Sequence, residues 1–405
     1  TAVVTMKSAA LWTDSRYFLA AEEQLEGTEY QLMKLKIEGT PTIAEWLGKE
    51  LQEVQSPEVG LDGMVNSYNY VKDLIYSLRK LGGITLRTNL DPLAQIWENR
   101  PSLPANPVEI QPLEYAGETL ASKVTRIRKS LRELHADGML VSALDDIAWT
   151  LNLRGTDVHC NPVFVSYLLI ESGKVSLFVD DNKLSPEVKQ YLQDNQVSLY
   201  KYNKVEKCLE SYSEYNILLD GNETSYYLWK AVKCQEIVAA GSPIPAMKAV
   251  KNKAEIEGYH SAMLKDGVAM VKFLKWLKPA VEAGGQTEIS IDEKLTSLRA
   301  EQKLFRDISF DTIAGYAQHG AIVHYEATPE TDVVLKPEGL ILIDSGAQYQ
   351  DGTTDITRTI ALGPVSREMK HVYTLVLKAH IQLELVKFPD GASGTQLDAV
   401  ARECM

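Results

Sequence analysis

The sequence lacks the features that mark several classes of protein. Its four cysteines show no Cys-x-x-Cys spacing, which disfavours a zinc or disulfide framework and favours free thiols in a reducing compartment. No run of about 18 apolar residues occurs, so no segment is predicted to span a membrane. The formal net charge is −13 and basic residues form only short groups. Because nucleic-acid binding needs a positive surface, no nucleic-acid partner is expected.

The composition is that of a folded protein. Of the 405 residues, 45% are hydrophobic and 24% charged, a balance that predicts a core rather than disorder. This length predicts two or three domains, and a cytoplasmic location is expected. The chain starts at Thr1 without Met and stops at Met405 within a helical pattern. Both ends are therefore expected to be cut, and the sequence leaves open whether a signal peptide preceded Thr1.

Apolar strands alternate with amphipathic helices in the first two regions, which predicts two α/β domains. The first domain is expected over 1–115. Its last part, 91–112, is proline-rich and is predicted to be a linker. The second domain is expected over 116–246. Its predicted strands are Met139–Val141, Phe164–Ile170, Val175–Val179, Val197–Tyr202 and Ile217–Leu219.

The two α/β regions share a short pattern. Leu61-Asp62-Gly63 followed by Ser67-Tyr68 recurs 158 residues later as Leu219-Asp220-Gly221 followed by Ser225-Tyr226. Asp14, which follows an apolar strand and precedes a helix, has a counterpart in Asp180. Two such matches in the same order indicate a duplicated α/β unit.

The third region, 247–405, has a different pattern. A long helix is predicted from apolar residues at three- and four-residue steps between Ile256 and Leu277, stopped by Pro279 and the Gly284-Gly285 pair. A second helix is predicted after Thr287. Strands are then expected at Ile322–His324, Leu340–Ile343 and Thr354–Leu362, and a helix at Arg367–Leu385. Helices flanking a bent antiparallel sheet make this an α+β domain.

Two aspartates in this region are the main candidates for chemistry. Asp344 ends an apolar strand and Asp355 opens the next. Burying carboxylates there is costly unless a cation pairs with them, and a divalent metal suits such oxygens. The alternative is a simple hairpin, with Asp351-Gly352 as its turn and solvated aspartates. That turn would place Asp344 opposite Thr359, roughly 14 Å along the strand from Asp355. A shared metal site would then need a longer or bulged connection over 346–353.

The sequence around these aspartates resembles that of a known family. Residues 343–349 (Ile-Asp-Ser-Gly-Ala-Gln-Tyr) and 351–359 (Asp-Gly-Thr-Thr-Asp-Ile-Thr-Arg-Thr) resemble the first metal-ligand segment of aminopeptidase P, the Xaa-Pro aminopeptidases, in their long three-domain form. Residues 12–18, 143–149, 152–155 and 320–325 resemble further stretches of that family, so the resemblance covers essentially the whole chain.

The resemblance implies a metal-dependent aminopeptidase that releases the N-terminal residue before proline, by attack of a metal-bound water or hydroxide. Two creatinase N-terminal-like domains would precede a pita-bread catalytic domain. Asp344 and Asp355 match two ligands of two divalent ions, most often Mn²⁺, with Co²⁺ or Zn²⁺ as alternatives. His324 matches a histidine that contacts the substrate and steadies the tetrahedral intermediate, and Arg16 matches an arginine that reaches the peptide. A homodimer is also implied.

Other interpretations stay open. His324 could be a packed histidine, Arg16 a surface ion-pair partner, and His319 the functional histidine instead. The family's remaining ligands, a histidine and two glutamates, have no counterpart before Met405, so the chain as it stands is expected to be inactive. A prolidase-like dipeptidase and a catalytically silent protein-binding module are the alternative functions; a creatinase-like enzyme is disfavoured because it needs no metal ligands.

Overall fold

The computed structural model describes all 405 residues, and the chain divides into two compact units. The first unit contains residues 1–266, 302–311 and 346–354. The second contains residues 267–301, 312–345 and 355–405. None of the helices combines the length and the apolar character that crossing a membrane requires.

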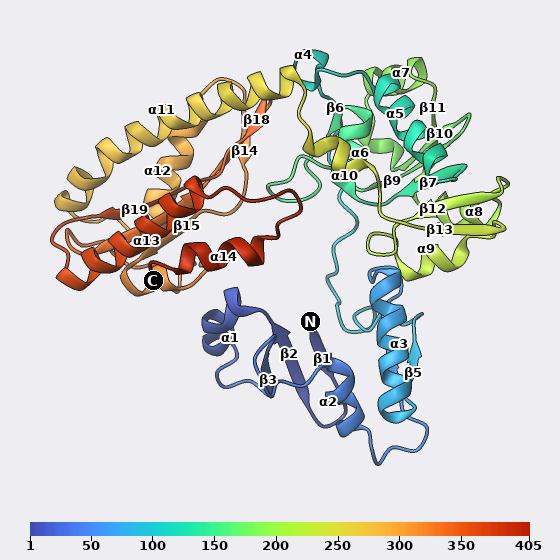
Figure 1. Cartoon of the computed structure of the whole chain (residues 1–405), viewed down its shortest axis with the longest axis horizontal. Coiled ribbons are helices and arrows are strands. Elements are labelled where there is room, and N and C mark those ends of the chain that lie inside the picture. The colour runs from blue at the N-terminus through green and yellow to red at the C-terminus, as the bar shows by residue number, and fades with distance from the viewer. The chain divides into compact units, whose positions relative to one another are not determined.

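The first unit begins with two small sheets (Figure 1). The three-stranded sheet β1-β2-β3 is covered by an apolar cluster that includes Trp12 and Trp46, whose rings meet edge to face at 5.5 Å. Thr42 caps the following helix through a capping box with Glu45. The elements of this region are β1 (Ala2–Val4), β2 (Ala9–Thr13), η1 (Ser15–Tyr17), α1 (Phe18–Gln24), β3 (Tyr30–Lys34), α2 (Ile43–Glu50), β4 (Glu58–Gly60), α3 (Tyr68–Gly82) and β5 (Thr85–Arg87).

A six-stranded sheet forms the centre of the first unit, in the order β11-β10-β9-β7-β12-β13. Side chains alternate between its two faces. Met139, Leu168 and Leu177 pack under α5, α6 and α7, whereas Leu140, Leu169 and Phe178 pack against α8 and α9. Figure 1 shows the sheet between these two helix layers. The elements are β6 (Glu109–Ile110), α4 (Leu113–Ala116), α5 (Leu120–Glu133), β7 (Gly138–Val141), α6 (Leu144–Leu151), β8 (Leu153–Arg154), β9 (Ser166–Glu171), β10 (Val175–Val179), η2 (Asp181–Lys183), α7 (Pro186–Asp194), β11 (Val197–Lys201), η3 (Tyr202–Lys204), α8 (Val205–Glu210), β12 (Asn216–Leu219), α9 (Tyr226–Ala231), β13 (Glu236–Ala239) and α10 (Ile244–Ala249).

The two copies of the repeated sequence pattern contact each other reciprocally. Tyr68 N–H donates to the Thr224 carbonyl at 3.0 Å, and Tyr226 N–H donates to the Asn66 carbonyl at 2.8 Å. A second such pair joins Asn69 to Gly221 and Tyr227 to Gly63. Every donor and acceptor has its counterpart 158 residues away in the other copy. This local twofold relation supports the predicted duplication.

A short antiparallel sheet, β14-β17-β18, completes the first unit. β14 (Phe305–Ile308) pairs with β17 (Ala347–Tyr349), which turns into β18 (Gly352–Thr353). Asp351, expected as an ordinary turn residue, forms a buried ion pair with Lys265, whose Nζ lies 2.6 Å from Oδ1. The aspartate therefore fixes the turn to α11 (Lys253–Ala283), the first part of which belongs to this unit.

The second unit packs helices against the sheet β15-β16-β19. Its core joins Phe273 and Leu277 of α11 to Leu295 of α12, and to Ile341 and Ile343 of β16. The elements are α12 (Glu288–Ala300), β15 (Ile313–Tyr316), η4 (Ala317–Ala321), β16 (Leu340–Ser345), β19 (Ile356–Ala361), α13 (Arg367–Leu385) and α14 (Gly394–Arg402). The predicted helices after Thr287 and at Arg367–Leu385 are confirmed.

Two local predictions are wrong. Pro279 does not stop α11, which continues to Ala283 and ends before Gly284, whose φ is +86°. Leu277 and Val281 are buried on either side of the proline, so core packing offsets the one backbone hydrogen bond that a proline removes. Residues 322–324 are not a strand but follow η4 as bend and turn.

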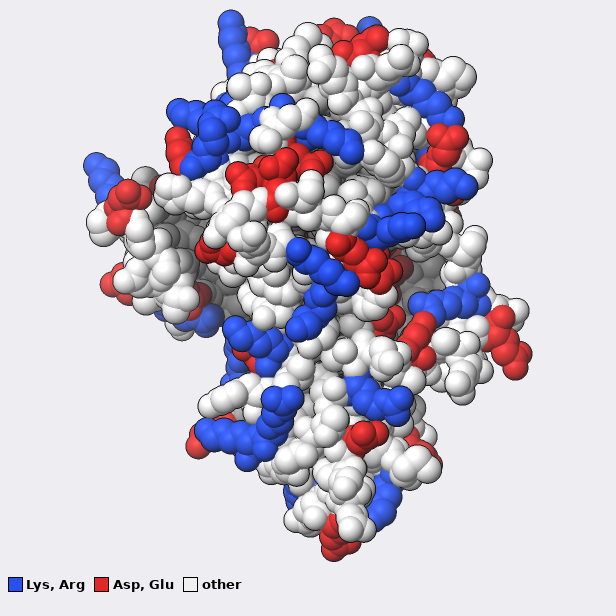
Figure 2. Space-filling view, turned by 90° about the vertical axis from the view of Figure 1, so that its right-hand side faces the viewer, with Lys and Arg blue, Asp and Glu red and all other residues white.

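Charged side chains of both signs are interspersed on the face shown in Figure 2. They form no extended area of one sign there, although the chain carries a net charge of −13.

Candidate metal centre

Asp344 and Asp355 come together through the register of one antiparallel strand pair. In the β16–β19 ladder Asp344 lies opposite Thr357 and Ser345 opposite Ile356. Asp355 immediately precedes this ladder, two residues from the partner of Asp344. The aspartates are thus diagonal neighbours on the ladder, a relation that leaves Cβ atoms about 7–8 Å apart or less. The two carboxylates are close enough to hydrogen-bond to each other.

The structure corrects the predicted connection between them. β17 and β18 pair Tyr349 with Gly352, so the turn residues are Gln350 and Asp351 rather than Asp351 and Gly352. Moving a two-residue turn by one position changes the pairing register by two, which replaces Thr359 with Thr357 opposite Asp344. The expected longer or bulged connection is therefore wrong. A tight turn one residue earlier brings the aspartates together.

Gly346 lies between β16 and β17 in the chain. A Cβ atom on it would lie 2.0 Å from the Thr354 carbonyl oxygen and 2.2 Å from Ser309 Oγ. Ser309 Oγ also donates to that carbonyl at 2.9 Å. Only glycine allows this close backbone approach, next to the strand end that carries Asp344.

The aspartates lack compensating positive charge among their described contacts. Asp344 Oδ1 is buried without a hydrogen-bond partner, which is costly for a carboxylate. Desolvation, and then the charge of Asp344, raise the pKa of Asp355 although this residue is exposed. A carboxylate whose ionisation its neighbour disfavours, beside a second carboxylate with an orphaned oxygen, fits a divalent cation. Such an ion takes more ligands than two aspartates supply, so a cation bound here would need further ligands.

A buried carboxylate organises the neighbouring loop, η4 and the residues after it. Glu288 is fully buried and accepts hydrogen bonds from Tyr316 N–H at 2.7 Å and Tyr325 Oη at 2.8 Å. His319 Nδ1 lies 3.0 Å from both Glu288 oxygens, and its ring stacks on Tyr325 at 4.4 Å. Burial raises the pKa of Tyr325 to about 12, so the phenol stays a proton donor to Glu288 at neutral pH.

The two histidine candidates have different environments. His319 is half-buried and held by Glu288, which is the contact pattern of a positioning residue. His324 is exposed, at a φ of +60°. This left-handed backbone is uncommon for a residue with a side chain and is found at functional sites. The Glu288 network holds Tyr325, the next residue, so it also limits where His324 can move.

Arg16, the candidate from the first unit, pairs with a neighbour in sequence. Its Nε lies 2.8 Å from Asp14 Oδ1 and its Nη2 lies 2.9 Å from Oδ2, a two-point contact. The hydrogen bond and charge of Asp14 raise the pKa of Arg16 further above its usual range. Arg16 is exposed, so its guanidinium is oriented yet accessible.

Sequence reasoning missed Glu288 and Tyr325. Glu288 follows the helix cap Thr287, and from the sequence alone it is indistinguishable from an ordinary acidic residue in the first turn of a helix. Only the fold shows that its side chain is completely buried. No local pattern signals this, because its three partners lie at least 28 residues away along the chain.

Two family descriptions match most of the chain. Residues 99–255 match the creatinase/prolidase N-terminal domain, and residues 257–405 match metallopeptidase family M24. The two matches adjoin near the start of α11.

Curated relatives and solved structures cover the chain from end to end. It is 38% identical over its full length to a probable Xaa-Pro aminopeptidase P of Sordaria macrospora, of which it covers 68%. It is 38% identical to the same-named protein of Neurospora crassa, of which it covers 61%. It superposes with a TM-score of 0.92 and 31% identity on an X-prolyl aminopeptidase from Caenorhabditis elegans, described as a cytosolic enzyme with a di-nuclear active site. All of this chain and 67% of that one are covered. The Pyrococcus furiosus prolidase shares the fold at 21% identity, with a TM-score of 0.52 over 68% of this chain and 77% of that one.

Proposed function

Because this chain belongs to the Xaa-Pro aminopeptidase P family of M24 metallopeptidases, as its sequence predicted, we propose that the whole protein releases the N-terminal residue from peptides with proline in second position. The chain spans 61–68% of the length of the curated relatives it matches, so this activity is proposed for the whole protein. The pairing of Asp344 with Asp355 is the observation that carries the proposal, because Asp344 Oδ1 is buried without a hydrogen-bond partner and the charge that acts on Asp355 is that of Asp344.

We assign the two aspartates to metal binding. Asp344 and Asp355 would hold two divalent cations together with ligands from outside this pair. Mn²⁺ is proposed, with Co²⁺ or Zn²⁺ as alternatives, because carboxylate oxygens suit each of them. Such ions supply a nucleophile from water at neutral pH and positive charge for a developing oxyanion.

Other residues of this chain would position the peptide. His324, on the loop that Glu288 and Tyr325 fix, is proposed to donate a hydrogen bond to the substrate carbonyl and to steady the tetrahedral intermediate. Arg16, held in a fixed direction by Asp14, is proposed to contact the peptide. A homodimer and a cytoplasmic location are further proposals, made by similarity to the family.

A peptide-release assay on the full-length protein tests the activity. With Mn²⁺ present, we expect release of arginine from Arg-Pro-Pro and little or none from Arg-Ala-Pro. Asp355→Asn should lose activity by at least about a hundredfold, since removing one charge-stabilising group typically costs that much. Lys378→Gln, an exposed change on α13, serves as the control and should leave the rate unchanged.

The assay also separates the alternative functions. Cleavage confined to the dipeptide Arg-Pro would indicate a prolidase. No cleavage of any peptide by metal-loaded protein would indicate a silent binding module. Equal cleavage of both tripeptides would refute the proline preference.

A further inference from the structure

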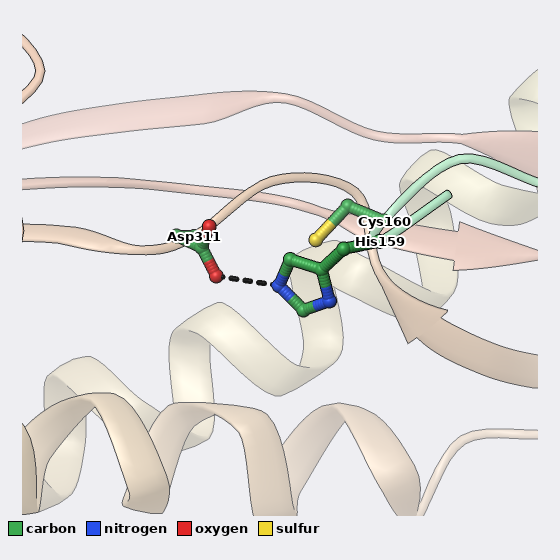
Figure 3. Close-up of side chains that lie close together, drawn as sticks. All are labelled: His159, Cys160 and Asp311. Carbon is green, nitrogen blue, oxygen red and sulfur yellow. Dashed lines mark hydrogen bonds and ion pairs between the residues drawn. The ribbon is translucent and has the colours of Figure 1, made fainter. Parts of the chain in front are cut away.

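A second group of side chains of the types that can bind a metal lies in the first unit, composed of residues that the proposed peptidase function does not use. His159, Cys160 and Asp311 place one imidazole nitrogen, one thiol sulfur and one carboxylate oxygen all within 4.8 Å of one another. His159 Nε2 lies 2.7 Å from Asp311 Oδ1. Figure 3 shows the three side chains converging from two separate segments, the loop between β8 and β9 and the segment after β14.

The loop that carries His159 and Cys160 is anchored on both sides. Asp157 Oδ2 accepts from Val165 N–H at 2.7 Å, and Asp157 also pairs with the buried Lys183. The Asn161 side-chain amide donates to the His159 carbonyl at 2.9 Å. Cys160 has a φ of +61° and is 7% exposed, so the backbone adopts an uncommon conformation that turns the thiol inward.

The opposite segment is anchored as well. Ser309, two residues before Asp311, donates its backbone N–H to the Gly346 carbonyl at 3.1 Å and its hydroxyl to the Thr354 carbonyl at 2.9 Å. Gln348 also donates to the Cys160 carbonyl at 3.0 Å. The three donors therefore stand on two braced segments, so little chain entropy would be lost when an ion binds.

The electrostatics at the thiol favour a bound cation over a reactive cysteine. Burial, and then the charges of Asp311 and Asp307, raise the pKa of Cys160 to about 11. A nucleophilic cysteine needs the opposite shift, which disfavours a Cys-His-Asp catalytic site. A metal ion reverses the effect, because a coordinating thiol is deprotonated outright.

We propose that His159, Cys160 and Asp311 form a binding site for a borderline-soft divalent ion, Zn²⁺ rather than Mn²⁺ or Mg²⁺. One thiolate, one imidazole and one carboxylate are a zinc ligand set, and three protein ligands leave the fourth tetrahedral position for water or an exchangeable ligand. His159 and Cys160 also line a cavity of about 680 Å³, from which such a ligand would approach. The site differs from the aspartate pair in containing sulfur, so it should prefer Zn²⁺ over Mn²⁺ more strongly than that pair does.

Cobalt absorption provides a test that the aspartate pair cannot mimic. Co²⁺ bound to a thiolate gives a near-ultraviolet charge-transfer band, whereas Co²⁺ on oxygen ligands gives none. On titrating the metal-free full-length protein we expect this band to reach the intensity of one Co²⁺–thiolate site per chain and to vanish when Zn²⁺ is added. The band should persist in the Asp344→Asn/Asp355→Asn variant, which removes the oxygen-only site.

Variants at the site and matched controls decide the outcome. Cys160→Ser should abolish the band, while Cys208→Ser and Cys234→Ser should keep it. Asp311→Asn retains the thiol and changes only an exposed carboxylate, and should weaken binding by at least about tenfold, the loss seen when even a supporting group of a metal ligand is removed. A missing band in the wild type, a band that survives in Cys160→Ser, or unchanged affinity in Asp311→Asn would each overturn the proposal and leave an ion pair beside a buried thiol.

Discussion

At the aspartate pair, the positions that folding imposes are electrostatically unfavourable for the carboxylates themselves. Folding places Asp344 and Asp355 close together, with Asp344 Oδ1 buried and unpartnered. In a metal-free protein this arrangement stores unfavourable electrostatic energy, since two carboxylates at such a distance resist joint ionisation. A bound cation would remove that cost, so metal binding and folding stability should be coupled at this position.

The pH dependence of metal-free stability is the residue-scale prediction. A raised native pKa means that folded Asp355 keeps its proton at a pH where the unfolded chain has lost it. Stability should therefore fall as pH rises from the ordinary carboxyl range through the raised native pKa, and stay level above it. Asp355→Asn should remove this fall and gain less than about 1 kcal/mol at neutral pH, because the residue is exposed.

Urea unfolding in the presence of a chelator, repeated from about pH 4 to pH 7, measures this effect. Asp390→Asn, an exposed change in the same unit, is the control. If Asp355→Asn follows the wild-type curve at every pH, the two carboxylates do not interact as described.

At the scale of elements, the close approach at Gly346 holds the strand register that the site requires. The hairpin turn at Gln350 and Asp351 sets the pairing, and Lys265 fixes that turn to α11. Gly346 then lets the chain pass within contact distance of Thr354 and Ser309. Any side chain there would push the backbone apart beside Asp344.

Gly346→Ala is the element-scale prediction. The added methyl group would overlap backbone and hydroxyl oxygens, and overpacking of this kind costs about 1–3 kcal/mol in the free energy of unfolding. Gly267→Ala is a matched control within α11, where nothing lies within 4 Å of the added carbon, and it should stabilise by about 0.5–1 kcal/mol because alanine favours helix. Chemical denaturation measures both, and equal effects of the two changes would contradict the close approach.

At the scale of the whole molecule, hydrogen bonds between the two copies of the repeated sequence pattern connect two regions of the first unit. The reciprocal hydrogen bonds between residues 63–69 and 221–227 are accompanied by stacking of Tyr68 on Trp229, with ring centroids 3.9 Å apart. The first region holds only small sheets of two or three strands, and such sheets need packing partners for stability. The stacked contact should therefore contribute to the stability of the region around α3.

Tyr68→Ala tests this contact. Loss of the stacked ring should cost about 2 kcal/mol, from lost apolar burial plus the aromatic pair. Because a multidomain chain need not unfold in one step, calorimetry should show a separate transition at lower temperature for the weakened part. Tyr76→Ala changes a 68% exposed ring on the same helix and should leave the profile unchanged; an identical early transition in both variants would assign the effect to the helix itself.

The sequence by itself determined the family, the fold class and many elements. Helix caps such as Thr42 and Thr287 and the short apolar run Val175–Val179 are local, so neighbouring residues suffice to predict them. The sequence around Asp344 and Asp355 also identified the peptidase family, although the distance between the two carboxylates was not known.

Only the tertiary structure decided how distant side chains meet. The strand register that brings the two aspartates together depends on a turn that lies one residue earlier than predicted. Because pairing in a sheet is set residue by residue, this small displacement changes which residues face each other. Glu288 with Tyr325, and His159 with Asp311, are 37 and 152 residues apart. They meet because the core packs distant segments together, and this packing cannot be predicted from any short stretch of sequence.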